Sequence, residues 1–169
     1  TPDFWWHLRT AEWIVEHGGL PVADPFSAFG MGKPWVAYSW LFELLIYRLY
    51  ESWGLMGVLL YTLVGSLAVG VALYVLVRGL LPHFAGAVAV TAAGIVSLVP
   101  VLSPRPWLLT ILFFFVELHI LFSVRRSGNA RLLWVLLPIF LLWANVHIQF
   151  VYGLGRSEEH TSELQSQFR

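Results

Sequence analysis

Residues Leu55 to Val77 read LMGVLLYTLVGSLAVGVALYVLV, an apolar run that contains no charged side chain. An α-helix of about 20 such residues is long enough to cross the roughly 30 Å hydrocarbon core of a bilayer. Three more apolar runs follow, at residues 84–102, 107–124 and 132–150. The sequence therefore predicts an all-α, polytopic membrane helical bundle with about four transmembrane helices in residues 54–155.

The overall composition agrees with a membrane protein. Of the 169 residues, 58% are hydrophobic and 12% are charged, whereas an average soluble domain has about 25% charged residues. The chain has no cysteine, so it offers neither a disulfide framework nor a thiolate metal site. The formal net charge of zero gives no indication of a nucleic-acid partner, and the expected partner is the lipid bilayer.

The polar part of the chain is residues 1–53, which we predict to be an external loop with two interfacial helices. The first helix is expected at about residues 4–17, with Asp3 before it and Gly18 after it. A loop rich in Pro and Gly leads to the second helix, at about residues 40–53. This helix is mostly apolar and has Trp and Tyr near its ends, which is typical of the membrane interface or of packing onto a bundle.

The last residues of the chain differ abruptly in composition. The eleven residues Arg156 to Ser166, RSEEHTSELQS, resemble one reading frame of a sequencing adapter, and the alternative is a natural polar tail. We therefore expect residues 156–169 to be an artefactual or disordered tail without a function. The chain starts with Thr1 and shows no signal peptide, so we expect a fragment of a longer protein, truncated near Gly155 and lacking helices at both ends.

The arginines predict the orientation of the bundle, because short cytoplasmic loops carry an excess of basic residues. Four of them fall in two loops on one side of the membrane: Arg78, Arg125, Arg126 and Arg131. With that side in the cytoplasm, residues 1–53, residues 103–106 and residues 145–147 all lie on the extracytoplasmic side. Several polar clusters would then meet at one face of the membrane.

Asp3 and Asp24 are the candidate catalytic carboxylates of this face. A carboxylate near a membrane surface can accept a proton from a hydroxyl group or hold a divalent cation. The structural alternatives, which the spacing favours, are a helix N-cap for Asp3 and a turn before Pro25 for Asp24. His7 lies one turn after Asp3 on the same helical face, where it could bind substrate or metal, or make a structural hydrogen bond.

Arg105 stands between Pro104 and Pro106 at the outer ends of two predicted spans. Its guanidinium could bind the phosphate of a lipid-linked donor, or it could extend to the head groups of the bilayer. Asn145 and His147 come near the outer end of the last span, at a similar depth. They could line the same substrate-binding cavity, or they could satisfy each other and neighbouring backbone groups.

Glu117 and His119 lie within the third predicted span. Ionisable groups inside a span are costly and indicate a functional role by default. The two side chains point about 200° apart around a helix, so they do not form one site. We interpret Glu117 as a pairing group between helices and His119 as a residue that reaches the membrane interface.

Two blocks carry a resemblance to a known family: DFWWHLRTAEWIVEHGGLPVADPFS, starting at Asp3, and GKPWVAYSWLFELL, starting at Gly32. With the later elements SPRPW and WANVHIQF, they resemble a family of poorly characterised bacterial multi-pass membrane proteins over most of residues 3–155. That family is more loosely similar to the GT-C class of membrane glycosyltransferases. Those enzymes use a polyprenyl-phosphate sugar as donor and carry a catalytic acidic residue in their first external loop.

The resemblance implies that Asp3 is the acidic residue of that loop, that Asp24 is the polar residue of its turn, and that Arg105 meets the donor phosphate. The segment Tyr38 to Trp40 departs from the family pattern, since a His-like position is replaced. The implied function is transfer of a sugar from a polyprenyl-phosphate donor to an extracytoplasmic acceptor in the bacterial inner membrane. The alternative is a non-catalytic protein, either a transporter or a lipid-binding or assembly scaffold.

Overall fold

The computed structural model describes residues 2–155, and the adapter-like segment, residues 156–166, lies outside the described residues. Within residues 2–155 the chain is helical apart from its loops. The only β-type pairing in this part of the chain is two isolated bridges, from Ala23 to Pro34 and from Asp24 to Met31. The expected all-α class is therefore confirmed.

The helices follow one another along the chain with short connections, except for the long loop after the first helix. Their bounds are α1 Pro2–His17, α2 Trp40–Trp53, α3 Leu55–Leu80, α4 Phe84–Leu98, η1 Val99–Val101, α5 Trp107–Ser127, η2 Ala130–Val135 and α6 Leu136–Val146. A further helical stretch begins at residue 150. Asp3 is thus in the first turn of α1 and is not its N-cap.

Three helical stretches of the described chain are long and apolar enough to cross a membrane: Leu55–Leu80, Phe84–Val101 and Trp107–Ser127. The fourth predicted span, residues 132–150, differs from this pattern. It starts as the 3-10 helix η2 and continues as α6 only to Val146, where His147 adopts an extended conformation. Pro138 lies in the first turn of α6 and has no amide hydrogen to donate to the preceding turn, which is one reason why the two segments differ in helical type.

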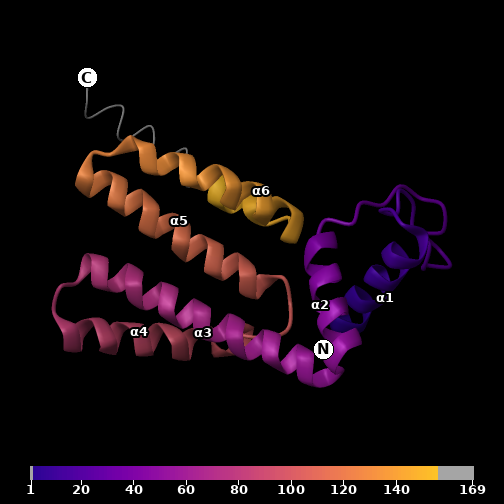
Figure 1. The fold of residues 1–169 in the computed structure, drawn as a ribbon, viewed down its shortest axis with the longest axis horizontal. Coiled ribbons are helices and arrows are strands. Elements are labelled where there is room, and N and C mark those ends of the chain that lie inside the picture. Colours follow the sequence, from indigo (N-terminus) through magenta and orange to yellow (C-terminus); the bar gives the residue numbers. More distant parts are fainter. Residues whose placement is uncertain (1, 156–169) are drawn as a thin grey trace.

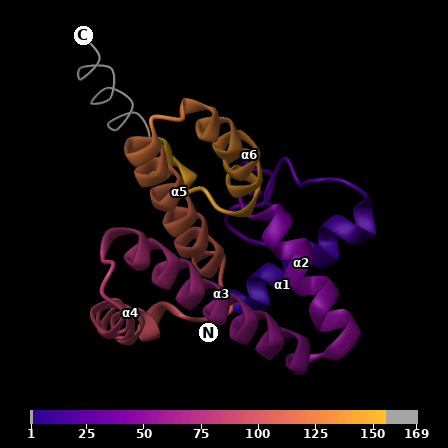
Figure 2. The same ribbon diagram turned by 60° about the vertical axis from the view of Figure 1, so that its left-hand side comes forward.

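The apolar helices form a bundle, and α1 and α2 cross its end (Figures 1 and 2). Helix α3 is the centre of this bundle, because it packs against α2, α4 and α5. Arg126, at the end of α5, donates a hydrogen bond to the carbonyl oxygen of Gly79, near the end of α3. The two arginine-bearing loops therefore lie at one end of the bundle, as the orientation argument requires, and α1 and α2 lie at the other.

The core lies at the junction between α1, α2 and the bundle. Phe42 and Ile46 of α2 are fully buried there, together with Phe4 and Leu8 of α1 and Leu108 of α5. Helix α2 thus packs against α1 on one side and against the bundle on the other. This packing fixes the positions of α1 and α2, and with them the polar side chains that they carry at this end of the bundle.

A glycine permits the close contact between α3 and α5. A β-carbon added at Gly65 would collide with the side chain of Leu108, which is itself fully buried. Gly65 therefore lets the two helices approach closely, as small residues do in membrane bundles.

We predict that Gly65→Leu weakens the bundle by about 1–3 kcal/mol, because an enlarged side chain must displace Leu108 from a packed site. The matched control is Val64→Leu, at an adjacent position of α3 that is exposed on the outer surface. Thermal unfolding of both variants in detergent micelles, followed by tryptophan fluorescence, tests this expectation. Equal unfolding temperatures for the two variants would contradict it.

Candidate functional site

Asp3 and Arg105 form an ion pair that joins the first turn of α1 to the loop before α5. Arg105 Nη2 lies 2.9 Å from Asp3 Oδ2, and both side chains are partly exposed. The main chain of Arg105 is held from the other side, since the hydroxyl of Tyr61 on α3 donates to its carbonyl oxygen at 3.1 Å. The amino-terminal segment and the arginine therefore share one end of the bundle, which was the central expectation of the orientation argument.

Arg105 has unused capacity to donate hydrogen bonds. Its Nε is buried and has no hydrogen-bond partner in the described part of the chain. A guanidinium has five N–H donors arranged to match a carboxylate or a phosphate. Because Nε is buried, a further anionic group would reach the guanidinium from its partly exposed side, where Asp3 pairs with Nη2.

His7 forms a second polar contact between α1 and α2. Its Nδ1 lies 3.0 Å from Oε1 of Glu43, whose side chain is only 5% exposed. The other carboxylate oxygen of Glu43 is buried without a hydrogen-bond partner among the described residues. With Nδ1 engaged by the carboxylate, the imidazole of His7 has a fixed orientation one turn from Asp3, and its Nε2 remains available.

Asn145 and His147 also reach this end of the bundle, but through separate contacts. Asn145 Oδ1 accepts a hydrogen bond from the indole N–H of Trp40 at 2.9 Å. His147 Nδ1 lies 2.9 Å from the hydroxyl oxygen of Thr110, which accepts a hydrogen bond from the indole of Trp143. These contacts bind the end of α6 to α2 and to α5, respectively.

His147 is partly buried, and its pKa is shifted. His147 lies beyond the end of α6 and outside the three spanning helices. Burial lowers the pKa of His147 from its usual value of 6.5, and the nearby charge of His7 lowers it further. The imidazole of His147 lies near the indole of Trp107, with 5.5 Å between the ring centroids, and Trp107 follows Arg105 by two residues. The chain after α6 therefore lies beside the segment that carries Arg105.

Asp24 has a different place in the structure. Its Oδ1 accepts hydrogen bonds from the amides of Phe26, at 2.8 Å, and Ser27, at 3.1 Å. Its other carboxylate oxygen lies against Gly30, where an added β-carbon would collide with it. The carboxylate thus organises its own turn in the loop after α1, as the structural alternative for this residue describes, and no contact joins it to Arg105.

Glu117 and His119 are not part of the polar region at this end of the bundle. Glu117 is fully buried in α5. Its Oε2 lies close to Gly153, since a β-carbon added to that glycine would lie 2.7 Å from it. Its carboxylate thus faces the chain that follows α6. The hydroxyl of Ser123 donates a hydrogen bond to the carbonyl oxygen of His119. The side chain of His119 is half-buried.

The polar region therefore contains Asp3, His7, Arg105 and His147, with Asn145 beside it. Sequence reasoning placed these residues at one membrane face but missed their partners, Glu43 and Thr110. A signal for Glu43 was present, because it follows Phe42 and precedes Ile46 by three residues, on the face of α2 that the apolar pattern buries. Among the described residues, no group of three or more His, Asp or Glu side chains is arranged to hold a metal ion.

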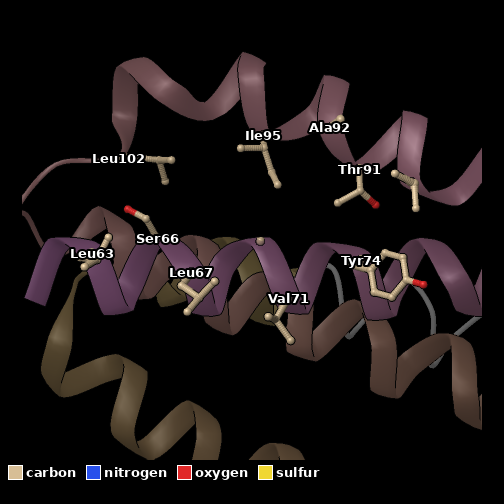
Figure 3. A pocket seen from close by; sticks show the side chains of 11 residues that line it. Leu63, Ser66, Leu67, Val71, Tyr74, Thr91, Ala92, Ile95 and Leu102 are labelled. Atoms are coloured by element: carbon tan, nitrogen blue, oxygen red, sulfur yellow. The ribbon is translucent and has the colours of Figure 1, made fainter.

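Two cavities lie near these groups. One, of about 430 Å³, lies between the loop after α1 and the end of α6, and Trp35, Tyr38, Trp40 and Asn145 line part of it. Another, of about 590 Å³, lies between α3 and α4 and is almost entirely apolar (Figure 3). The first suits an amphipathic molecule, and the second suits a hydrocarbon chain.

We predict that His7→Phe destabilises the protein by about 3 kcal/mol, because it leaves the buried carboxylate of Glu43 without its partner. The matched control is His17→Phe on the same helix, where the imidazole is exposed. The unfolding temperature in detergent micelles should fall on the order of 10 °C for the first variant and change little for the second. A similar small change in both variants would show that the Glu43 contact is weak.

We also predict that acid weakens the fold through His147. The unfolded chain binds a proton on this residue near pH 6.5, whereas the folded protein does so only at lower pH. Above about pH 6.5, His147 therefore has no effect on the free energy of unfolding. As the pH falls from about 6.5 toward the lowered pKa of His147 in the folded protein, the free energy of unfolding decreases. Thermal unfolding between about pH 7.5 and about pH 5 should show a smaller pH dependence in His147→Gln than in the wild type, with His17→Gln as the unchanged control. Identical pH dependence in His147→Gln and the wild type would contradict this role.

One end of the bundle thus holds an arginine paired with a partly exposed carboxylate, and a histidine oriented by a buried glutamate. Comparisons with protein-family models, with curated proteins and with solved structures found no match to this chain.

Proposed function

We propose that this protein transfers a sugar from a polyprenyl-phosphate donor to an acceptor on the extracytoplasmic side of the bacterial inner membrane. The observation that carries the proposal is the ion pair of Arg105 with Asp3 at the end of the bundle that α1 and α2 cross. An arginine at the membrane surface can hold the phosphate of a lipid-linked donor, and a carboxylate next to it can act on the acceptor hydroxyl.

The ion pair is weak enough for a phosphate to replace Asp3 on Arg105. The Arg105 side chain is 33% exposed and that of Asp3 is 58% exposed. Pairs with this degree of exposure typically contribute no more than about 1 kcal/mol. A phosphate offers more acceptor oxygens and matches the fork of the guanidinium, so it can take the place of Asp3 on Arg105. The displaced carboxylate is then free and lies beside the bound donor.

In the reaction that we propose, Asp3 accepts the proton of the acceptor hydroxyl. The hydroxyl oxygen forms a bond to the anomeric carbon of the sugar, and the bond between that carbon and the phosphate oxygen breaks. The electron pair of the broken bond stays on the phosphate, where the positive charge of Arg105 stabilises it. His7, one turn from Asp3 and oriented by Glu43, contacts the substrate through its available Nε2.

We predict that Asp3→Asn lowers sugar transfer by about 100-fold or more, the usual contribution of a general base. The assay measures transfer by the whole protein in vesicles from radiolabelled polyprenyl-phosphate hexoses to an extracted acceptor fraction. Glu12→Gln is the matched control, since Glu12 is also an ion-paired carboxylate on α1. Unchanged transfer in Asp3→Asn rejects the role of Asp3 and leaves the ion pair as a structural link of a non-catalytic scaffold.

We further predict that Arg105→Gln weakens the binding of farnesyl phosphate, a soluble short-chain probe, by about tenfold or more, because a charge-assisted contact is lost. Farnesol, which has the same chain and no phosphate, should bind both proteins equally. Arg48→Gln is the control, because Arg48 is exposed and paired with Glu51 on α2. Equal affinity of Arg105→Gln and the wild type for farnesyl phosphate would rule out Arg105 as the phosphate site.

A further inference from the structure

The cavity between α3 and α4 is a groove with two long walls. Residues of α3 form one wall and residues of α4 form the other, and Leu102 lies at one end (Figure 3). The lining residues are Leu63, Ser66, Leu67, Gly70, Val71, Tyr74, Val88, Thr91, Ala92, Ile95 and Leu102. Both walls belong to helices that are long and apolar enough to span a membrane, so the groove lies at the depth of the hydrocarbon core.

The lining of the groove is matched to hydrocarbon. Only Ser66, Tyr74 and Thr91 among its lining residues have polar side chains. The Thr91 hydroxyl is buried and has no hydrogen-bond partner in the described part of the chain. A polar ligand in this groove would meet almost no hydrogen-bonding groups, so its desolvation would not be compensated.

The length of the groove corresponds to one leaflet of a bilayer. On α3 the lining runs from Leu63 to Tyr74, which at 1.5 Å per residue is roughly 16 Å, about half of the hydrocarbon thickness. Leu63 is nearer to the start of α3, where α2 and α1 pack, and Leu102 lies at the same end of the groove (Figure 3). Tyr61, two residues before Leu63, donates its hydroxyl hydrogen to the carbonyl oxygen of Arg105, so the Leu63 end of the groove is the end near the polar region. Tyr74 lies six residues before the other end of α3, so the groove runs past the middle of this helix.

Arg105 lies close in sequence to Leu102, the lining residue at one end of this groove. It follows Leu102 by three residues, which fully extended span at most about 11 Å. The segment is shorter than this limit, because the amide of Arg105 donates a hydrogen bond to the carbonyl oxygen of Ser103 at 2.7 Å. A positively charged residue thus follows closely after Leu102, which lines the polar-region end of an apolar groove.

We propose that the groove between α3 and α4 holds the isoprenyl chain of the donor lipid while Arg105 holds its phosphate. This inference rests on the function proposed above and adds the place at which the lipid part of the substrate binds. A polyprenyl phosphate has one chain joined directly to its phosphate, which matches one groove that ends beside one arginine. A phospholipid has two chains separated from the phosphate by glycerol, so only one of them would fit.

The experiment uses a farnesyl phosphate probe with a diazirine at the far end of its chain, which forms a covalent bond to nearby protein when illuminated. The whole protein in vesicles of fixed phosphatidylcholine composition is labelled, and the labelled peptides are identified by mass spectrometry. We expect the label in peptides of α3 and α4 that line the groove. Labelling spread over all exposed apolar faces would overturn the proposal.

Variants that fill the groove give the decisive comparison. Ala92→Trp on one wall, and Leu67→Trp on the other, should each reduce specific labelling by about tenfold, equivalent to the loss of burial of roughly two methylene groups. Val90→Trp is the matched control, because Val90 is exposed on α4 outside the groove. Thr91→Val, which removes the hydroxyl and keeps the shape, should leave labelling intact. Normal labelling in both groove variants, or a loss in Thr91→Val, would contradict a hydrocarbon chain in this place.

Further controls distinguish an isoprenyl chain from a phospholipid chain in the groove. They also distinguish lipid binding in the groove from the proposed sugar transfer. A diazirine-bearing farnesol that labels as strongly as the phosphate probe would refute the coupling of the groove to Arg105. Suppression of the label by an equal amount of phosphatidylglycerol would show that a phospholipid chain occupies the groove and would overturn the isoprenyl assignment. Groove-specific, phosphate-dependent labelling in a protein that transfers no sugar would support this inference and reject the enzymatic function.

Discussion

The packing of α2 between α1 and the bundle is the constraint on which the rest of the structure depends. Phe42 and Ile46 are completely buried at this junction, where α1, α2 and the bundle share one apolar core. Burial of two large apolar side chains contributes on the order of 3–6 kcal/mol. This packing places the first turn of α1 next to the loop before α5, so the position of every polar group in the site follows from it.

The polar contacts around this core differ in their strength and therefore in what they can do. The contact of His7 with Glu43 is nearly removed from water, so its loss would leave a buried carboxylate unsatisfied. The pair of Asp3 and Arg105 is partly exposed and weak, so a competing anion can open it. The site thus combines a rigid element, which orients an imidazole, with an exchangeable element, which can respond to a ligand.

The membrane helices were predictable because a long apolar run without charges has few structural alternatives to a spanning helix. The arginines of the loops indicated which ends of these helices lie together. Arg105, Asp3 and His147 could be assigned to one end of the bundle for the same reason. The partners of these residues could not be predicted, since Glu43 and Thr110 contact them only through the crossing of helices that are far apart in sequence. The end of α6 at Val146 was not predicted, although His147 and Gln149 interrupt the apolar run there, and His147 is extended and contacts α5.

The buried carboxylate of Glu43 has a consequence for the assembly of the protein. A mostly apolar helix such as α2 would enter the acyl region by itself, but the ionisable Glu43, in the first turn on its buried face, makes that depth costly. His7 of α1 supplies the partner of one Glu43 carboxylate oxygen. The docked position of α2 therefore depends on the presence of α1 beside it as well as on the apolar face of α2 itself.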